Sequence, residues 1–276
     1  MGELRKPKKI PKKLLDIVGV TRGDMQSMNA FFQSAENKKN CEPFEQLNQK
    51  YVSLWQRYVD SFDELQKNVE NKVHRREYAR GGESIHRGFY CPSSMDLVVG
   101  NCNRGRLLKR PPSSNNKTYE YLFDSHDRMI CVYKFDRSLS DEMNPVAIEF
   151  IIYQEEQVLS LIFESFRSRC LSCISACQYE SNKLMRYEFA LCPLSGKEGC
   201  IEINVEAYEY ERHLFQSLFR STYLPSTRLL TTRKYVFSRD EAGDLCTYTA
   251  EELCGYKAGL ASEKTVYEVR GADRKR

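Results

Sequence analysis

From residue 118 onward, apolar and polar residues alternate along the chain, as in the run that contains Tyr119, Tyr121 and Phe123. A period of two is typical of β-strands with one buried face and one more polar face. Short polar stretches interrupt the alternation, and a second apolar stretch follows each of them. The pattern therefore predicts consecutive β-hairpins through the second half of the chain.

The predicted hairpin occurs five times. In each copy an aromatic residue ends the first apolar stretch, and these anchor aromatics lie 30, 26, 31 and 27 residues apart: Phe123, Tyr153, Tyr179, Tyr210 and Phe237. Self-similarity at a fixed period indicates a repeated supersecondary unit. Two strands per unit give about ten consecutive strands in a long antiparallel meander. A sheet of that length must coil or be covered on its apolar face, because twist accumulates across strands.

A helical pattern precedes the hairpins. Apolar residues at three- and four-residue steps predict an amphipathic helix over about 43–75. A short helix is expected over 22–35, and the stretch 36–42 is interpreted as a polar break. The apolar stripe of the longer helix must pack on the short helix, on the sheet or on another chain. The predicted fold class is therefore α+β and mostly β, with the helices as the natural cover for part of the sheet.

Charge and composition divide the chain into four parts: a basic tail (1–13), a helical region (14–80), a connecting segment (81–117) and a hairpin-repeat domain (118–276). The connecting segment contains a possible short strand at Met95–Val99 and a proline-containing loop. The tail carries a net charge of about +5, whereas the other 263 residues carry about −1. A nucleic-acid-binding domain normally has a basic face on its folded body, so nucleic-acid binding is disfavoured.

The sequence predicts a cytoplasmic protein with no membrane contact. No segment approaches the roughly 18 consecutive apolar residues of a membrane helix, and the amino terminus does not resemble a signal peptide. Eleven cysteines, an odd number at uneven spacing, favour reduced thiols in a reducing compartment.

Metal and cofactor motifs are weak, and we expect neither group. Cys170 and Cys173 form one CxxC pair, whereas structural zinc commonly uses two such pairs. Their odd separation would place them on opposite faces of a strand, and Cys173 and Cys177 are interpreted as core residues. The sequence contains no phosphate loop, dinucleotide fingerprint or HExxH motif.

One segment leaves an enzymatic alternative open. His86 lies near Cys91, and nucleophilic catalysis by a thiol requires a base within hydrogen-bond reach. A basic cluster follows in residues 104–110, made of Arg104, Arg106, Lys109 and Arg110. This cluster suits a phosphate group or an acidic partner surface, but a solvated strand edge that discourages aggregation is the simpler interpretation. We assign no catalytic residue.

Tyrosines supply the principal candidates for partner contact, since tyrosine offers a large rigid surface with a polar end. The chain contains 17 tyrosines, and two pairs stand out at Tyr119/Tyr121 and Tyr208/Tyr210. Tyrosine is also favoured on half-buried strands, so about half of them are expected to be packing residues. The predicted contact set combines these four tyrosines with the four basic residues of 104–110.

The first repeat, Tyr121-x-Phe123-Asp124-x-x-x-Arg128-Met129, resembles the signature of YD (Rhs-type) hairpin repeats, with Asp127 in place of a glycine. The last repeat, from Tyr235 to Leu245, is similar with an insertion. The layout from Gly88 to Leu108, followed by tyrosine-rich hairpins, also resembles uncharacterised bacterial immunity-type proteins. The repeat array and the lack of a convergent set of acid, base and nucleophile predict a non-catalytic protein-binding module. The second resemblance implies in particular an immunity-type protein that neutralises a toxin, and it carries no catalytic residues.

Overall fold

The computed structural model describes most of the chain between residues 30 and 255, together with the backbone of one later strand. The described residues are 30–31, 33–81, 93, 105–112, 117–136, 144–165, 169–193, 199–211, 214–241, 243, 245–255 and 265–268. The elements in chain order are α3 (Ala35–Tyr58), α4 (Phe62–Lys72), β1 (Arg75–Arg80), β2 (Arg106–Leu108), β3 (Thr118–Phe123), β4 (Met129–Phe135), β5 (Ala147–Tyr153), β6 (Val158–Glu164), β7 (Cys170–Glu180), β8 (Lys183–Leu191), β9 (Glu202–Glu211), β10 (Leu214–Leu224), β11 (Leu229–Arg239), β12 (Leu245–Cys254) and β13 (Thr265–Glu268).

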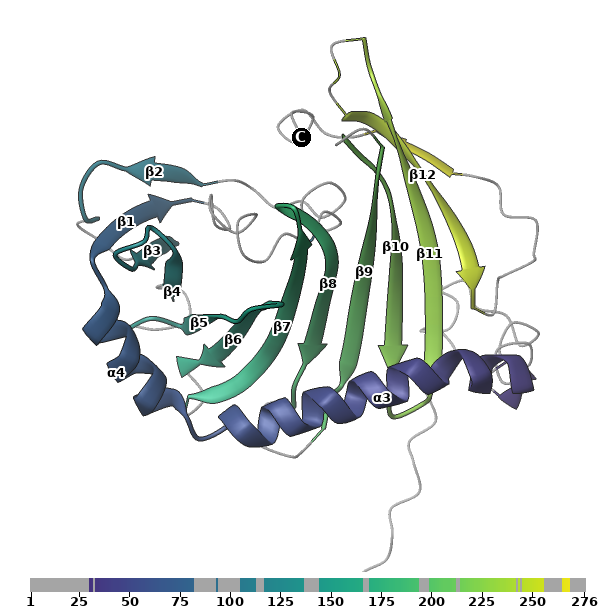
Figure 1. The fold of residues 1–276 in the computed structure, drawn as a ribbon, viewed down its shortest axis with the longest axis horizontal. Coiled ribbons are helices and arrows are strands. Elements are labelled where there is room, and N and C mark those ends of the chain that lie inside the picture. Colours follow the sequence, from purple (N-terminus) through teal and green to yellow (C-terminus); the bar gives the residue numbers. More distant parts are fainter. Residues whose placement is uncertain are drawn as a thin grey trace, which may run out of the picture.

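The thirteen described strands form one antiparallel sheet whose spatial order nearly follows the chain. Strands β3 to β13 pair in sequence order, and β1 lies between β3 and β2 at one edge. Figure 1 shows the sheet as a strongly curved surface, as expected where strand twist accumulates over many strands. The predicted α+β class, mostly β with helices before a long meander, is confirmed.

The five predicted repeats are five hairpins, β3–β4, β5–β6, β7–β8, β9–β10 and β11–β12. Each anchor aromatic lies within the last three residues of the first strand of its hairpin. Since neighbouring strands are antiparallel throughout, all five hairpin turns are at the same end of the sheet. We call this end the turn end, and the end that carries the links between hairpins the link end.

The two helices cover one face of the sheet. In Figure 1, α3 crosses the link ends of β8 to β11, and α4 continues beside the earlier strands. Phe62, the first residue of α4, makes edge contacts with the rings of Phe150 and Phe163, at centroid distances of 5.5 and 5.4 Å. One continuous cluster results, the helix-side cluster, in which Tyr51 and Trp55 of α3 pack with residues of β3 to β11.

The predicted single helix over 43–75 is wrong in its limits. Helix α3 begins at Ala35, because Ser34 caps it by accepting a hydrogen bond from the backbone N–H of Asn37 at 3.1 Å. The expected polar break over 36–42 is therefore helical. The helix is interrupted between Tyr58 and Phe62, and its predicted last residue instead begins strand β1. The helical region thus ends at Lys72 rather than at residue 80.

The opposite face of the sheet carries a second cluster, the tyrosine cluster. Its buried members are Ala79, Tyr119, Tyr121, Phe123, Met129, Val132, Ile151, Cys177, Leu184, Tyr187, Tyr208, Leu218, Tyr235, Phe237, Leu245 and Tyr248. Ser93 is buried on this side, where its hydroxyl donates to the carboxylate of Glu206 at 2.8 Å. The bond fixes one point of the connection between β1 and β2 against the middle of the sheet.

Several predicted features lie outside the described residues. They are the basic tail, the short helix over most of 22–35, and the possible strand at Met95–Val99.

Candidate functional site

The hairpins are joined at the turn end by a contact that recurs along the array. The hydroxyl of Tyr153 donates to the backbone carbonyl of Met129 in the preceding hairpin at 3.0 Å, and the hydroxyl of Tyr210 donates to the carbonyl of Leu184 at 2.9 Å. In both cases the acceptor residue pairs across its own hairpin with the preceding anchor aromatic. An anchor tyrosine thus bonds to an equivalent atom of the previous repeat.

The fifth repeat makes the same contact with a different side chain. Its anchor, Phe237, has no hydroxyl, and Arg239 donates instead to the carbonyl of Phe215 at 3.2 Å. Phe215 pairs across its hairpin with Tyr210, so its carbonyl is the equivalent acceptor. The acceptor is therefore the equivalent backbone carbonyl in all three contacts, whereas the donor is a tyrosine hydroxyl in two of them and an arginine side chain in the third.

Basic residues cover two of these anchors. The guanidinium carbon of Arg128 lies 5.1 Å from the ring centroid of Tyr153, and the ammonium nitrogen of Lys183 lies 5.4 Å from that of Tyr210. Each basic residue directly precedes the acceptor residue of its hairpin. Cation–π attraction of this kind contributes about 0.5–1 kcal/mol at exposed positions. Burial raises the pKa of Tyr153 to about 12, so its hydroxyl remains a hydrogen-bond donor.

The first turn explains the residues that resemble the YD signature. One carboxylate oxygen of Asp124 accepts the backbone N–H groups of His126 and Arg128, at 2.9 and 3.0 Å, and the other accepts the guanidinium of Arg128 at 2.9 Å. Asp127 has a φ of +58°, in the left-handed region where glycine is favoured. The turn thus holds the aspartate and arginine of the signature together and uses Asp127 where the signature has glycine.

Acidic and basic side chains differ in what they do at the turn end. The basic residues Arg128, Lys183 and Arg239 contact the array through the rings, carboxylate and carbonyls described above. Asp124 is buried in the first turn, but the other described acidic residues there are exposed: Asp127, which pairs with Arg75, and Glu155, Glu156, Glu180, Glu211, Asp240 and Glu241. The described part of this end therefore presents an acidic surface to solvent, which we call the turn surface.

Two apolar side chains lie at this surface. Leu214 is 54% exposed and Tyr179 is 37% exposed. Leu214 opens β10 and pairs with Glu211, the last residue of β9, and Tyr179 precedes Glu180. The turn surface therefore combines negative charge with exposed apolar area, as protein-binding surfaces often do.

Most of the tyrosines predicted to contact a partner are interior residues. Tyr119, Tyr121 and Tyr208 are buried in the tyrosine cluster, and the rings of Tyr119 and Tyr121 stack with centroids 6.2 Å apart. Tyr210 is half-buried and joins two hairpins. The expectation that these four side chains form an exposed contact surface is therefore corrected. Alternation placed them on one face without showing that this face is covered.

The predicted basic residues are located differently. Arg106, Lys109 and Arg110 are exposed, on or just after the edge strand β2, where Leu107 is also 49% exposed. Arg104 lies outside the described residues, as do His86 and Cys91 of the enzymatic alternative. The described part of the basic cluster thus forms a small basic edge, and the suggested histidine–cysteine pair stays untested.

Two buried glutamates were not anticipated from the sequence. On the helix side, Glu188 accepts from Lys50 at 2.8 Å, from the hydroxyl of Tyr51 at 3.0 Å and from Arg186 at 2.6 Å. Burial alone would raise the pKa of Glu188, but hydrogen bonds and charge from Lys50 and Arg186 outweigh burial and hold the pKa below its ordinary value. The carboxylate is thus a fixed anion between helix and sheet.

The second glutamate, Glu206, is buried on the tyrosine side. It accepts from Ser93 and from the hydroxyl of Tyr208, and Arg220 lies 3.7 Å from its carboxylate. Both glutamates occupy positions where strand alternation alone would predict apolar residues. Only the partners on α3, β10 and the β1–β2 connection explain them, and no local pattern reveals those partners.

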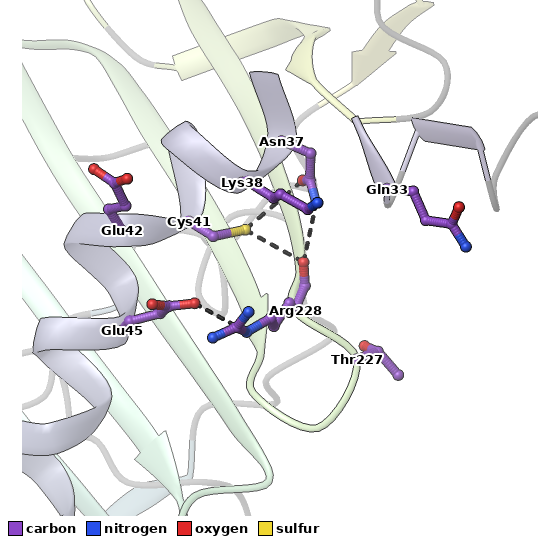
Figure 2. Close-up of a pocket in the computed structure, with 8 residues that line it drawn as sticks. All are labelled: Gln33, Asn37, Lys38, Cys41, Glu42, Glu45, Thr227 and Arg228. Carbon is purple, nitrogen blue, oxygen red and sulfur yellow. Dashed lines mark hydrogen bonds and ion pairs between the residues drawn. The ribbon is translucent and has the colours of Figure 1, made fainter. Parts of the chain in front are cut away.

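A pocket of about 430 Å³ lies between the start of α3 and the link that joins β10 to β11, as Figure 2 shows. The backbone carbonyl of Arg228 accepts from the side-chain amide of Asn37 at 3.2 Å and from the thiol of Cys41 at 3.3 Å. The Arg228 guanidinium also pairs with Glu45 at 3.0 Å. Burial raises the pKa of Cys41, which disfavours a nucleophilic thiolate. We interpret these contacts as fastening α3 to the sheet.

The described residues contain no group of three or more histidine, cysteine or acidic side chains suited to holding a metal ion. None of the described helices is long and apolar enough to span a membrane.

Together these features define a helix-covered antiparallel meander of five linked hairpins with an acidic turn surface. No family model, no curated protein and no solved structure matches the chain.

Proposed function

We propose that the protein is a non-catalytic binding protein that contacts a basic protein partner through the turn surface. The observation that carries the proposal is the unequal use of charge at the turn end. Arg128, Lys183 and Arg239 there contact a neighbouring hairpin, whereas seven acidic residues are exposed, of which Asp127 pairs with Arg75. A surface of one sign attracts a partner of the opposite sign and increases the rate of association.

The side chains of Leu214 and Tyr179 add exposed apolar area to the turn surface, and a bound partner would bury this area. Charge alone supplies steering and orientation, whereas buried aromatic and aliphatic anchors supply most of the binding energy of a protein interface. An immunity-type protein that neutralises a basic toxin in the cytoplasm is the particular form of this proposal, supported by the hairpin array and by the resemblance of the Gly88–Leu108 sequence, followed by tyrosine-rich hairpins, to immunity-type proteins.

The test compares four forms of the tagged protein expressed in the organism that carries the gene. The turn variant carries Glu155→Lys, Glu156→Lys and Glu241→Lys, and the edge variant carries Arg106→Glu, Lys109→Glu and Arg110→Glu. A matched control reverses the exposed residues Glu42 of α3 and Glu64 in the first turn of α4, both at the link end of the sheet. Each form is purified after brief crosslinking, and the recovered proteins are compared quantitatively.

We expect one basic protein to be recovered with the wild type, the edge variant and the control, and to be lost from the turn variant. With the purified pair, affinity should fall at least tenfold in the turn variant and should weaken as salt concentration rises. Equal recovery by the wild type and the turn variant would refute the turn surface. If the partner were lost only from the edge variant, the binding surface would instead be the basic edge around β2.

A further inference from the structure

Four cysteines converge at the link end of the sheet: Cys170 and Cys173 in β7, Cys192 directly after β8, and Cys200 directly before β9. The backbone N–H of Cys192 donates to the carbonyl of Ser172 at 2.7 Å. The thiol of Cys170 lies 3.9 Å from the carbonyl of Pro193. The β8–β9 link is therefore held against the beginning of β7, and thiols from three chain segments share one region.

Backbone register places two of these cysteines opposite one another. The ladder between β8 and β9 ends with Leu191 paired to Glu202, but the N–H of Ile201 donates to the carbonyl of Leu191 at 2.8 Å. That bond shifts the register by one residue, so that Cys192 and Cys200 come opposite one another just beyond the ladder. Their position is of the non-hydrogen-bonded type but is bounded by this single bond, since Pro193 has no N–H to donate a second one. Such pairs have Cα atoms about 4.5 Å apart with side chains on one face, within the roughly 4.4–6.8 Å range of disulfides.

The burial of the two cysteine side chains agrees with their lying opposite one another on the same face. Cys192 is fully buried in the helix-side cluster, and Cys200 is partly buried and packs against the same cluster. We propose that Cys192 and Cys200 form a dithiol that is converted reversibly into an intramolecular disulfide by low-molecular-weight disulfides of the glutathione class. This modification site is independent of the turn surface, because the cysteines lie at the opposite end of the strands.

The order of the two reaction steps follows from exposure. Cys200 is the accessible sulfur, and a hydrogen bond from the thiol of Cys192 lowers the pKa of Cys200, although its burial opposes this. The Cys200 thiolate attacks the small disulfide, forms a mixed disulfide and expels one small thiolate. Cys192 then loses its proton and attacks the Cys200 sulfur, which expels the second small thiolate. Two protein thiols are oxidised, and one small disulfide is reduced to two small thiols.

The disulfide would close the link between β8 and β9 beneath α3. It replaces a thiol–thiol hydrogen bond in the helix-side cluster with a covalent bond, without separating the two strands. Oxidation should therefore rigidify the link end while preserving the sheet.

The test uses the reduced full-length protein, equilibrated in glutathione buffers with an increasing fraction of glutathione disulfide. Free thiols are alkylated, and the protein is digested with trypsin and analysed by mass spectrometry. Trypsin cleaves after Lys197, between the two cysteines, so the disulfide joins two separate peptides. We expect this linked pair to become the main form of both cysteines as the oxidised fraction rises, and to disappear on reduction.

Serine variants distinguish the two roles. Cys192→Ser should leave glutathione attached to Cys200, whereas Cys200→Ser should leave Cys192 unmodified because it is buried. Cys246→Ser is the matched control: Cys246 is partly exposed in β12, with its thiol on the carbonyl of Ser238, and the 192–200 linkage should persist in that variant.

Circular dichroism melting curves show whether each variant is folded before oxidation. The proposal is overturned if folded wild-type protein yields a different cysteine pair, retains glutathione on Cys200 without closing the ring, or gives the 192–200 linkage only in denaturant. Recovery of one zinc ion per chain that Cys200→Ser removes would also overturn it, in favour of a thiolate metal site.

Discussion

The two faces of the sheet share one alternating pattern but use it for different chemistry. On the helix side, one of the 14 buried residues contributed by strands is a tyrosine, whereas on the other side six of 16 are tyrosines. The helix side is mostly aliphatic and phenylalanine, and it is covered by α3 and α4. The tyrosine side brings hydroxyl groups close to Glu206 and Ser93.

This difference follows from what covers each face. A helix that crosses a sheet removes water over a broad area, and a hydroxyl there requires a specific partner to offset its desolvation. Tyr51 satisfies this requirement by donating to Glu188. On the tyrosine side, polar groups occur among the rings, so a tyrosine can bury its ring and still bond its hydroxyl. Side-chain type, rather than periodicity, thus distinguishes the two faces.

The largest expected effect comes from removing an aromatic ring between helix and sheet. Phe62→Ala deletes the ring that contacts Phe150 and Phe163, and that lies under the guanidinium of Arg169 at 4.6 Å. Because truncation of a buried phenylalanine leaves a cavity, we expect the free energy of unfolding to fall by about 3–5 kcal/mol. Urea denaturation followed by far-ultraviolet circular dichroism measures the change.

Val236→Ala is the matched control, since Val236 is 38% exposed on the same sheet and should cost less than about 0.5 kcal/mol. If Phe62→Ala were no more destabilising than this control, α4 would not be part of the cooperative core.

The second effect tests the buried anion on the helix side. Glu188→Gln removes the charge that Lys50 and Arg186 share, while keeping a side chain of similar shape. We expect a loss of about 2–3 kcal/mol in unfolding free energy at neutral pH, because charge-assisted hydrogen bonds are replaced by weaker ones. Glu209→Gln is the control: Glu209 is half-exposed and pairs with Lys234 at 3.6 Å, and the bond it accepts from Ser217 can be kept by the glutamine oxygen, so the loss of its charge should cost under about 1 kcal/mol.

The pH dependence of the same variant has a defined sign. The pKa of Glu188 is lower in the folded state than in the unfolded chain, so its ionisation stabilises the fold above the unfolded value of about 4.3. This contribution is lost as pH falls through the lowered folded pKa. We therefore expect the stability difference between wild type and Glu188→Gln to narrow progressively below about pH 4. A difference that stays constant down to pH 2 would contradict the assigned role of the carboxylate.

Much of the sheet could be predicted from the sequence because its determinants are local. Anchor aromatics such as Tyr153 and Tyr210 precede short polar turns, and the alternation on either side defines both strands of a hairpin. The helix limits were less predictable. Ser34 caps α3 by accepting from Asn37, and the hydroxyl of Ser61 donates to the carbonyl of Tyr58 at the break. The helical period does not encode these contacts.

The candidate surface was harder to predict from the sequence, because it also depends on contacts between distant residues. Tyr121 and Tyr208 have the residue type of a binding surface, yet both are buried in the folded chain. At the turn end the useful signal was a basic residue at the start of one hairpin's second strand that contacts the anchor aromatic of the next hairpin, as Lys183 contacts Tyr210. That signal is readable once the repeats are aligned. The buried Glu188 and Glu206 have no comparable signature.

The third effect concerns the hydroxyl groups that join the hairpins. Tyr153→Phe and Tyr210→Phe each remove one bond to the preceding hairpin while keeping the ring. We expect each to lower the unfolding free energy by about 1 kcal/mol, and the double variant to lose roughly the sum, because the two bonds join different hairpins. Tyr58→Phe is the control, since its hydroxyl makes no hydrogen bond within the described part of the chain. Costs equal to that of the control would show that the rings alone hold the hairpins together.

The smallest effect tests the first turn, where Asp127 occupies the position that is glycine in the YD signature. Its φ of +58° strains a side chain with a Cβ, and Asp127→Gly relieves that strain. The substitution also removes the ion pair with Arg75 at 3.0 Å, but Asp127 is 78% exposed, so that pair contributes little. We expect stability to rise by up to about 1 kcal/mol, measured as a shift in the urea midpoint at constant slope. Asp124→Asn in the same turn should act in the opposite direction, because Asp124 accepts two backbone N–H groups and the Arg128 guanidinium. A loss of stability in Asp127→Gly would mean that its carboxylate, rather than its backbone conformation, determines this turn.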